Sequence, residues 1–76
     1  MLDRLKREDD PQLSDRERQV IEMATLGLTN AEIARRLKVT SYAIKFHLTS
    51  VYRKLGVANR TEAAVAYLGI QHKDVG

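Results

Sequence analysis

The sequence predicts an all-α fold in which four helices form one small domain. Three observations favour it: apolar residues recur at three- and four-residue spacings, no alternating β pattern separates them, and capping side chains mark helix starts four times. A chain of 76 residues has room for one small core. We therefore expect economical helix packing without a large enclosed catalytic pocket.

Residues 1–12 are rich in charge and, after Met1, contain only Leu2 and Leu5 as large apolar side chains. We interpret them as a charged linker or tail and place the folded domain at residues 13–76. The sequence has no cysteine, so neither disulfides nor thiolate metal sites are expected. No apolar run approaches the roughly 20 residues of a membrane span. We expect a soluble, cytoplasmic protein that has no membrane partner.

A first helix is predicted from Asp15 to Leu26. Ser14 stands three residues before Glu17, and this pair can form a capping box, in which the serine oxygen accepts a free backbone N–H and the glutamate reaches back. Gly27 can take the left-handed conformation that closes a helix. The first helix thus has a start signal and a stop signal.

Two further helices are predicted at Asn30–Leu37 and Ser41–Leu55. Thr29 starts the first of them, again three residues before a glutamate, and Thr40 can cap the second. A glycine follows the second as its stop signal. Only residues 38–40 separate the two helices, so they must cross at a steep angle. This spacing predicts a helix-turn-helix.

A fourth helix, supporting the other three, is predicted from Arg60 to about Gln71, with Asn59 and Glu62 as a third capping box. One side carries the apolar or small residues Ala63, Ala66, Tyr67 and Ile70. A second stripe, with Thr61, Val65 and Leu68, lies roughly opposite. A terminal helix in so small a domain cannot bury both sides, so we predict a weak homodimer through the second stripe.

Positive charge is concentrated in the central part of the chain. Residues 29–55 contain one acidic residue, Glu32, and six basic ones: Arg35, Arg36, Lys38, Lys45, Arg53 and Lys54. The chain as a whole has a net charge of only +3. A basic segment within a nearly balanced chain is typical of a protein that meets a phosphate backbone on one face.

The helix predicted at Ser41–Leu55 has two different sides. A helical step of about 100° per residue places one apolar stripe toward the core: Ile44, Leu48, Val51 and Leu55. The opposite side carries Tyr42, Lys45, Phe46 and Thr49, together with Ser50 and Arg53. Lysine donates to guanine acceptors, and threonine and phenylalanine can contact the methyl group of thymine. Tyr42, Lys45, Phe46 and Thr49 are therefore the candidate base contacts on double-stranded DNA.

Phosphate contacts are expected around both helices of the helix-turn-helix. Free N–H groups at Thr29 and Asn30 give the shorter helix a positive end that can bind a phosphate, and Thr40 and Ser41 occupy the same place on the longer one. Four cations complete the predicted phosphate set: Arg35, Arg36, Arg53 and Lys54. Such contacts position a protein on DNA without reading its sequence.

The sequence contains no residue pattern typical of an enzyme active site. The two histidines, His47 and His72, lie on separate segments, no metal-ligand cluster is evident, and no nucleophile has a base nearby in the sequence. We therefore predict no catalytic residue, no metal and no cofactor.

Four motifs, taken together, resemble the DNA-binding domain of the LuxR/FixJ/NarL transcription regulators. They are an L-S-x-R-E-R-x-V opening from Leu13, G-L-T-N-x-E-I-A from Gly27, I-K-x-H from Ile44, and K-L-G-V-x-x-R from Lys54. The resemblance covers residues 13 to about 67. It implies a third helix in the major groove, with base-reading positions at Lys45, Phe46 and Thr49, and a fourth helix that pairs on two half-sites.

The resemblance also implies transcription regulation as part of a response regulator, with RNA polymerase as a further candidate partner. Regulators of this kind usually carry an amino-terminal sensor or phospho-acceptor domain, so the chain is either a cut carboxyl-terminal domain or a short regulator. Two departures concern the reading helix: Ala43 replaces a usual threonine, and Phe46 a frequently polar residue. Two other functions stay open, a promoter reader like region 4 of a sigma factor and a helical protein-interaction module.

Overall fold

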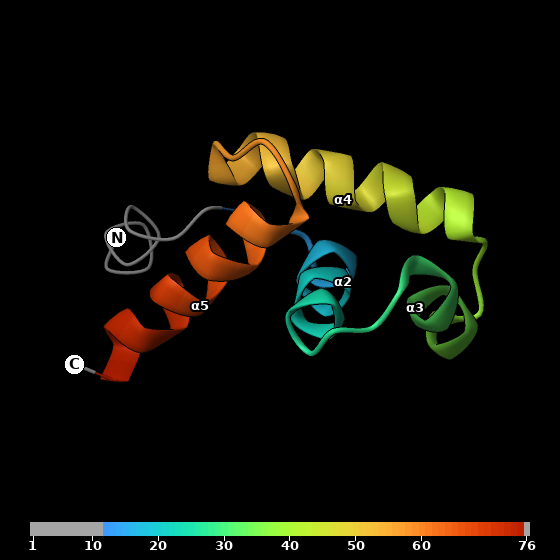
Figure 1. Ribbon diagram of the computed structural model, residues 1–76, viewed down its shortest axis with the longest axis horizontal. Helices are drawn as coiled ribbons and strands as arrows, with labels where there is room; N and C mark the ends of the chain where they lie inside the picture. Colours follow the sequence, from blue (N-terminus) through green and yellow to red (C-terminus); the bar gives the residue numbers. More distant parts are fainter. Residues whose placement is uncertain (1–11, 76) are drawn as a thin grey trace.

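The computed structural model describes residues 12–75, with side chains described up to Ile70. Its four helices, labelled in Figure 1, are α2 (Asp15–Thr25), α3 (Asn30–Leu37), α4 (Ser41–Leu55) and α5 (Arg60–Val75). No strand occurs among these residues. The predicted all-α, four-helix fold is confirmed. The linker or tail predicted at residues 1–12 lies outside the described residues, except for Gln12.

Capping boxes start α2 and α3 as predicted. The Ser14 hydroxyl accepts the Glu17 N–H at 3.1 Å, and the Ser14 N–H donates to Glu17 Oε1 at 2.9 Å. Thr29 and Glu32 repeat this exchange at 3.1 and 2.8 Å. Each box satisfies backbone N–H groups that have no partner inside the helix, which fixes where the helix begins.

The starts of the other two helices are also capped, one of them differently from the prediction. At α4 the Thr40 hydroxyl accepts the Ala43 N–H at 3.0 Å. At α5 the Asn59 side chain accepts the Glu62 N–H at 2.9 Å, but the Glu62 carboxylate accepts from Ala58 at 2.8 Å instead of from Asn59. The glutamate thus reaches back one residue further than in a capping box.

A left-handed residue closes each of α2, α3 and α4. Gly27 (φ +91°) and Gly56 (φ +71°) lie after α2 and α4, as predicted. Lys38, at φ +60°, closes α3 in the same way, and its N–H donates to the carbonyls of Ala34 and Arg35. A lysine carries no sequence signal for this conformation, so only the two glycine positions were foreseeable.

One buried cluster joins the helices. It consists of Val20, Ile21, Ala24, Ile33, Ala34, Ile44, Leu48, Val51, Ala63 and Tyr67. The predicted core stripe of α4 contributes three of these residues, and its fourth member, Leu55, is partly buried against them. Helix α2 packs against both α4 and α5, and α3 packs against α4. The core therefore holds α4 by one side only.

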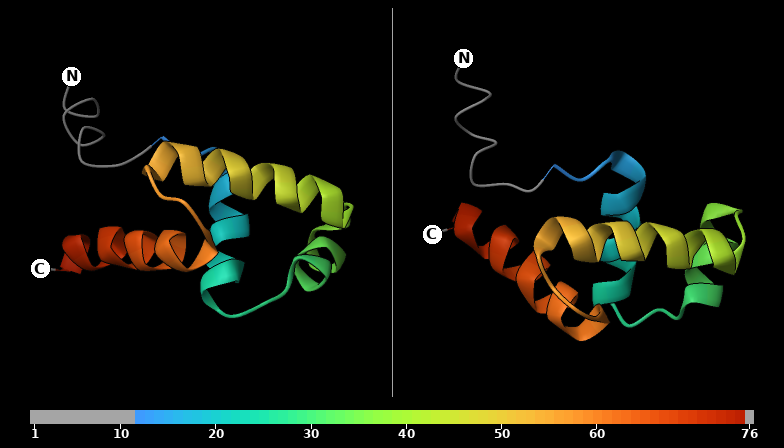
Figure 2. Two further views of the ribbon diagram at one scale, coloured as in Figure 1. Left: turned by 45° about the horizontal axis from the view of Figure 1, so that its top comes forward. Right: turned by 90° about the horizontal axis from the view of Figure 1, so that it is seen from above.

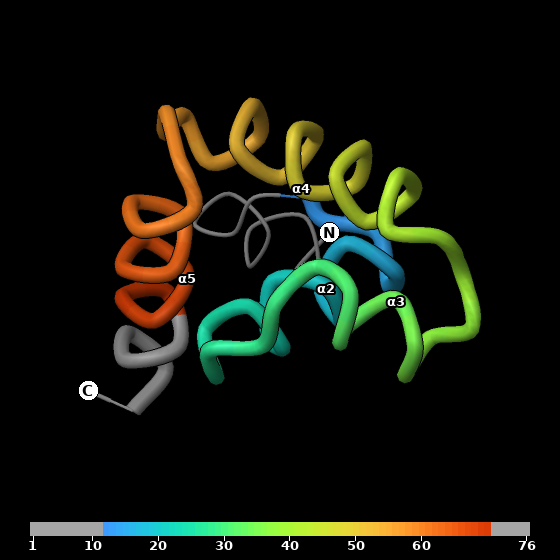
Figure 3. Tube along the Cα trace, turned by 45° about the vertical axis from the view of Figure 1, so that its right-hand side comes forward, coloured from blue at the N-terminus to red at the C-terminus, as the bar shows by residue number. Residues whose placement is uncertain are grey.

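The arrangement leaves the other side of α4 open. In Figure 3, the described parts of α2, α3 and α5 all lie on the same side of α4. Seen from above in the right-hand view of Figure 2, α4 crosses α2 steeply and begins beside α3. The short link between α3 and α4 produces the predicted helix-turn-helix. Helix α5 continues to Val75, beyond the predicted end near Gln71, and extends away from the other helices (Figure 1).

Candidate nucleic-acid interface

The open side of α4 carries the four residues predicted to contact bases. Tyr42, Lys45, Phe46 and Thr49 are all exposed, and the exposed fractions of the two aromatic residues are 79% and 69%. We call this set the α4 outer face. Two aromatic rings exposed on one helix face in a domain this small form an apolar surface that normally has a partner.

Thr49 and Ser50 follow each other in the chain but have different surroundings. The Thr49 hydroxyl donates to the Lys45 carbonyl at 3.0 Å, and the rest of the side chain remains exposed. The Ser50 hydroxyl instead donates to Glu17 Oε2 at 2.7 Å, and Ser50 is half-buried. The expectation that Ser50 belongs to the outward side is therefore wrong, because a buried carboxylate of α2 holds it.

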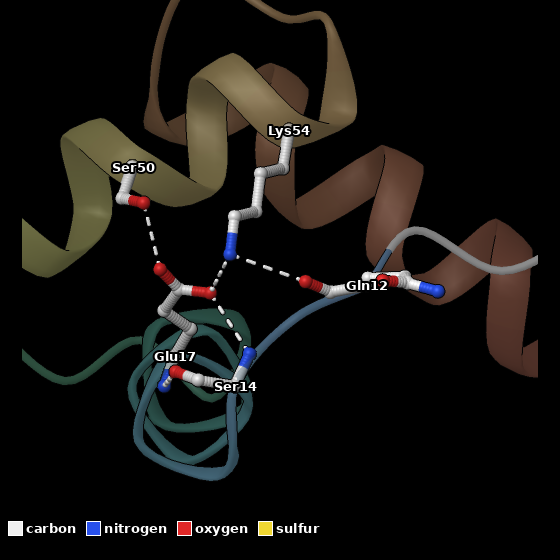
Figure 4. Close-up of polar contacts among 5 residues, drawn as sticks. All are labelled: Gln12, Ser14, Glu17, Ser50 and Lys54. Carbon is white, nitrogen blue, oxygen red and sulfur yellow. Dashed lines mark hydrogen bonds and ion pairs between the residues drawn. The ribbon is translucent and has the colours of Figure 1, made fainter.

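Glu17 is the centre of a polar cluster between α2 and α4 (Figure 4). Only 6% of this residue is exposed. Burial alone would raise its pKa, but hydrogen bonds from the Lys54 ammonium, the Ser50 hydroxyl and the Ser14 N–H outweigh burial. Together with the positive charge of Lys54 they lower the pKa of Glu17 from 4.5 to about 2. Glu17 is thus ionised at neutral pH, and it ties α2 to α4.

Lys54, one of the predicted phosphate contacts, has partners inside the protein. Its Nζ lies 2.8 Å from Glu17 Oε1 and donates to the Gln12 carbonyl at 3.1 Å (Figure 4). A phosphate would have to compete with a buried carboxylate that, among residues 12–70, pairs with this cation alone. The geometry favours a structural role for Lys54, and we leave it out of the phosphate set below.

The amino-terminal end of α3 differs from the open anion site expected there. The N–H of Thr29 is bonded to the Glu32 carboxylate, so it is not free. The backbone hydrogen bond from Thr29 is the main reason why the pKa of Glu32 is lowered, and the resulting negative charge opposes a phosphate. Asn30 contributes its side-chain oxygen to Arg60 at 3.1 Å. The backbone N–H groups of Asn30 and Ala31, in the first turn, remain available as donors to a phosphate.

Arg60 is a structural residue whose partners the sequence did not reveal. Besides Asn30, its guanidinium donates to the carbonyls of Ala24 and Leu28. One side chain from the start of α5 thereby holds the end of α2, the following loop and the start of α3. The K-L-G-V-x-x-R motif marks the position of Arg60, but its contacts depend on the fold.

The remaining phosphate candidates are exposed and lie around the helix-turn-helix. They are Arg35 and Arg36 on α3, Thr40 and Ser41 at the start of α4, and Arg53 near its end. The Thr40 hydroxyl is occupied as the α4 cap. Lys38, in the connecting turn, adds one exposed cation. These groups give the surface next to the α4 outer face a positive charge.

Helix α5 has the two sides expected of it. Ala63 and Tyr67 are buried against the core, and the Tyr67 hydroxyl donates to Glu22 at 2.7 Å. Burial is the main reason why the pKa of Tyr67 is raised. On the opposite side Thr61, Val65 and Leu68 are exposed, the two apolar residues by 66% and 45%. This second stripe has no partner among the described residues.

Among the residues that the structure describes, no three histidine, aspartate or glutamate side chains are grouped so that they could hold a metal ion. None of the helices there combines the length and apolar character required to cross a bilayer.

Comparison with known proteins adds a family match. The model described as bacterial regulatory proteins, luxR family, matches residues 11–67. The HTH-type transcriptional regulator YhjB of Escherichia coli is 45% identical over 53 residues, covering 70% of this chain and 26% of YhjB.

Two further relatives have regulatory names. The nitrate/nitrite response regulator protein NarL of Escherichia coli is 41% identical over 54 residues, covering 71% of this chain and 25% of NarL. The transcriptional activator protein AhyR of Aeromonas hydrophila is 46% identical over 59 residues, covering 75% of this chain and 23% of AhyR. The chain therefore spans about a quarter of the length of each of these relatives.

Proposed function

The chain belongs to the luxR family of bacterial regulatory proteins, and we propose that it binds double-stranded DNA to regulate transcription, with α4 in the major groove. The observation that carries the proposal is the α4 outer face. The core holds α4 by its opposite side, and Tyr42, Lys45, Phe46 and Thr49 stay exposed as one surface. A major groove admits one α-helix, which reads base edges through its outward side chains.

Phosphate contacts fix the position of α4 in the groove. We assign this role to the backbone N–H groups at the start of α3, to Thr40 and Ser41, and to the exposed cations Arg35, Arg36 and Arg53. Thr29 lies next to these free donors, but its own backbone N–H donates to the Glu32 carboxylate and is not available to a phosphate. These contacts supply affinity that depends on salt but not on base sequence.

Selection from a random duplex library, followed by fluorescence anisotropy on the selected duplex, tests the proposal. We expect selection to enrich a shared sequence, and Lys45→Ala and Thr49→Ala to reduce discrimination between that duplex and a scrambled one. An exposed residue at the end of α2, Leu26, serves as the control through Leu26→Ala. Failure to enrich any sequence, or equal discrimination in all variants, would contradict DNA reading by α4.

A homodimer on two half-sites is the second part of the proposal. The apolar pair Val65 and Leu68, with Thr61, is exposed on the side of α5 that faces away from the core. A second copy related by a twofold axis would cover this stripe and place two α4 helices on neighbouring half-sites. The stripe is short, so the dimer is expected to be weak without DNA.

Sedimentation of the protein on a duplex with two half-sites tests the pairing. Val65→Glu and Leu68→Glu introduce charges on the stripe but not in the core, so they should abolish cooperative binding while single half-site binding persists. Thr61→Ala, a mild change on the same side, should reduce cooperativity only slightly. Unchanged cooperativity in both glutamate variants would remove the dimer from the proposal.

A further inference from the structure

Phe46 and Thr49 form one neighbouring pair on the α4 outer face. They are three residues apart on α4, a spacing that places two side chains side by side on a helix. Both are exposed, Phe46 by 69%. When α4 lies in a groove, such a pair faces the same base pair or two adjacent ones.

The hydrogen bond of Thr49 determines what its side chain can offer to DNA. A hydroxyl has one hydrogen, and Thr49 donates it to the Lys45 carbonyl at 3.0 Å. What remains for a partner is an oxygen lone pair and a methyl group. In the major groove guanine shows acceptors only, at N7 and O6, so it offers Thr49 nothing to accept. The donors in the groove are the N6 amino group of adenine and the N4 amino group of cytosine.

Phe46 settles the choice between these two bases. Its ring makes no hydrogen bond, and only thymine presents an apolar group, the 5-methyl, in the major groove. A G·C pair has the cytosine amino group but no methyl. An A·T pair has both an amino donor and a methyl.

We propose that Phe46 and Thr49 together select A·T pairs at the positions that they face. Phe46 covers the 5-methyl group of thymine, and the Thr49 oxygen accepts a hydrogen bond from the N6 amino group of adenine. Lys45, a donor on the same face, contacts acceptors on flanking bases. This inference rests on the proposed function, since it concerns how the same helix face chooses its site.

The test removes single groups from the DNA and from the protein. In the duplex obtained by selection, each thymine is replaced in turn by deoxyuridine, which lacks the methyl, and each adenine by purine deoxyriboside, which lacks the amino group. Affinities are measured by anisotropy for the wild-type chain, Phe46→Ala, Thr49→Val and Leu26→Ala. Both reading-face residues are exposed, so circular dichroism should show all variants folded.

For the wild-type chain we expect one thymine position at which loss of the methyl weakens binding about fourfold, the factor for burying one methyl-sized group. At one adenine, in the same pair or the next, loss of the amino group should weaken binding about fivefold, as for one neutral hydrogen bond. Phe46→Ala should abolish only the thymine effect, and Thr49→Val only the adenine effect. Leu26→Ala should keep both.

Two results would overturn the inference. One is a selected duplex whose binding is indifferent to every methyl and amino deletion, and the other is a deletion effect that persists in the matching protein variant. Either would leave DNA binding itself intact. If the wild-type chain bound no duplex at all, the proposed function would fail instead, so the two failures are distinguishable.

Discussion

At the scale of single residues, the ion pair of Glu17 and Lys54 shows how a long-range contact can change the role of a side chain. They are 37 positions apart, so no local pattern reveals their contact. The sequence identified Glu17 only as half of a capping box, which is correct but incomplete. Its second carboxylate oxygen accepts a hydrogen bond from Ser50, and the Lys54 side chain, still 37% exposed, neutralises its charge. Lys54, which was predicted to contact a DNA phosphate, is thus held by an ion pair inside the protein.

Glu17→Gln should change how stability depends on pH. The folded-state pKa of about 2 lies below the ordinary 4.5, so the ionised group stabilises the fold fully above about pH 4.5. This contribution, up to about 3 kcal/mol, is lost as the pH falls toward 2. The free energy of unfolding of the wild-type chain, measured by urea denaturation, should therefore fall over this window more than that of Glu17→Gln. Parallel pH profiles of the two proteins would show that Glu17 is not stabilised as described.

Two left-handed positions give a reciprocal pair of stability predictions. Lys38→Gly should raise the free energy of unfolding by about 0.5 to 1 kcal/mol, because glycine adopts φ +60° without a steric cost. Gly56→Ala should lower it by about 1 kcal/mol for the same reason, since an added Cβ meets no atom within 4 Å and the cost is conformational. Thermal unfolding followed by circular dichroism measures both. Shifts of the same sign in the two variants would contradict the explanation.

At the scale of elements, α4 is the helix whose two sides the sequence predicted best. Apolar periodicity located the stripe of Ile44, Leu48 and Val51, and these residues are buried. The same periodicity misplaced Ser50. It gives the direction in which a side chain leaves the helix, but it does not show that Glu17 of α2 accepts a hydrogen bond from Ser50. Helix starts were foreseeable from local caps. The end of α3 at Lys38 was not, since its conformation is imposed by the turn into α4.

Helix α3 should contribute affinity without specificity. Arg36 is exposed on it, so Arg36→Ala should weaken binding to all duplexes alike. It should also make the dependence of log affinity on log salt shallower by about one unit. Anisotropy titrations at several salt concentrations measure this slope. Lys54→Met is the contrasting variant: because Glu17 holds this lysine, the slope should stay unchanged while the fold loses stability. A slope that changes for Lys54→Met but not for Arg36→Ala would reverse these assignments.

At the scale of the whole molecule, α2 serves as the support for both exposed surfaces. It packs against α4 and α5, so the α4 outer face and the second stripe of α5 are presented by one core. Fold class, helix order and both exposed stripes could be predicted from caps and periodicity. The contacts of Arg60, Lys54 and Ser50 could not, because each joins residues about 30 or more positions apart. Those contacts determine which charged groups remain available to a ligand.

The most direct test of the central claim is an amide chemical-shift titration of the chain with the selected duplex. If α4 enters the major groove, the largest shifts should fall on residues 41–53 of α4 and on the start of α3. The carboxyl-terminal part of α5 should change little on a single half-site. Shifts clustered on α5 or on the α2 surface around Leu26, with α4 unaffected, would contradict the claim that α4 binds DNA.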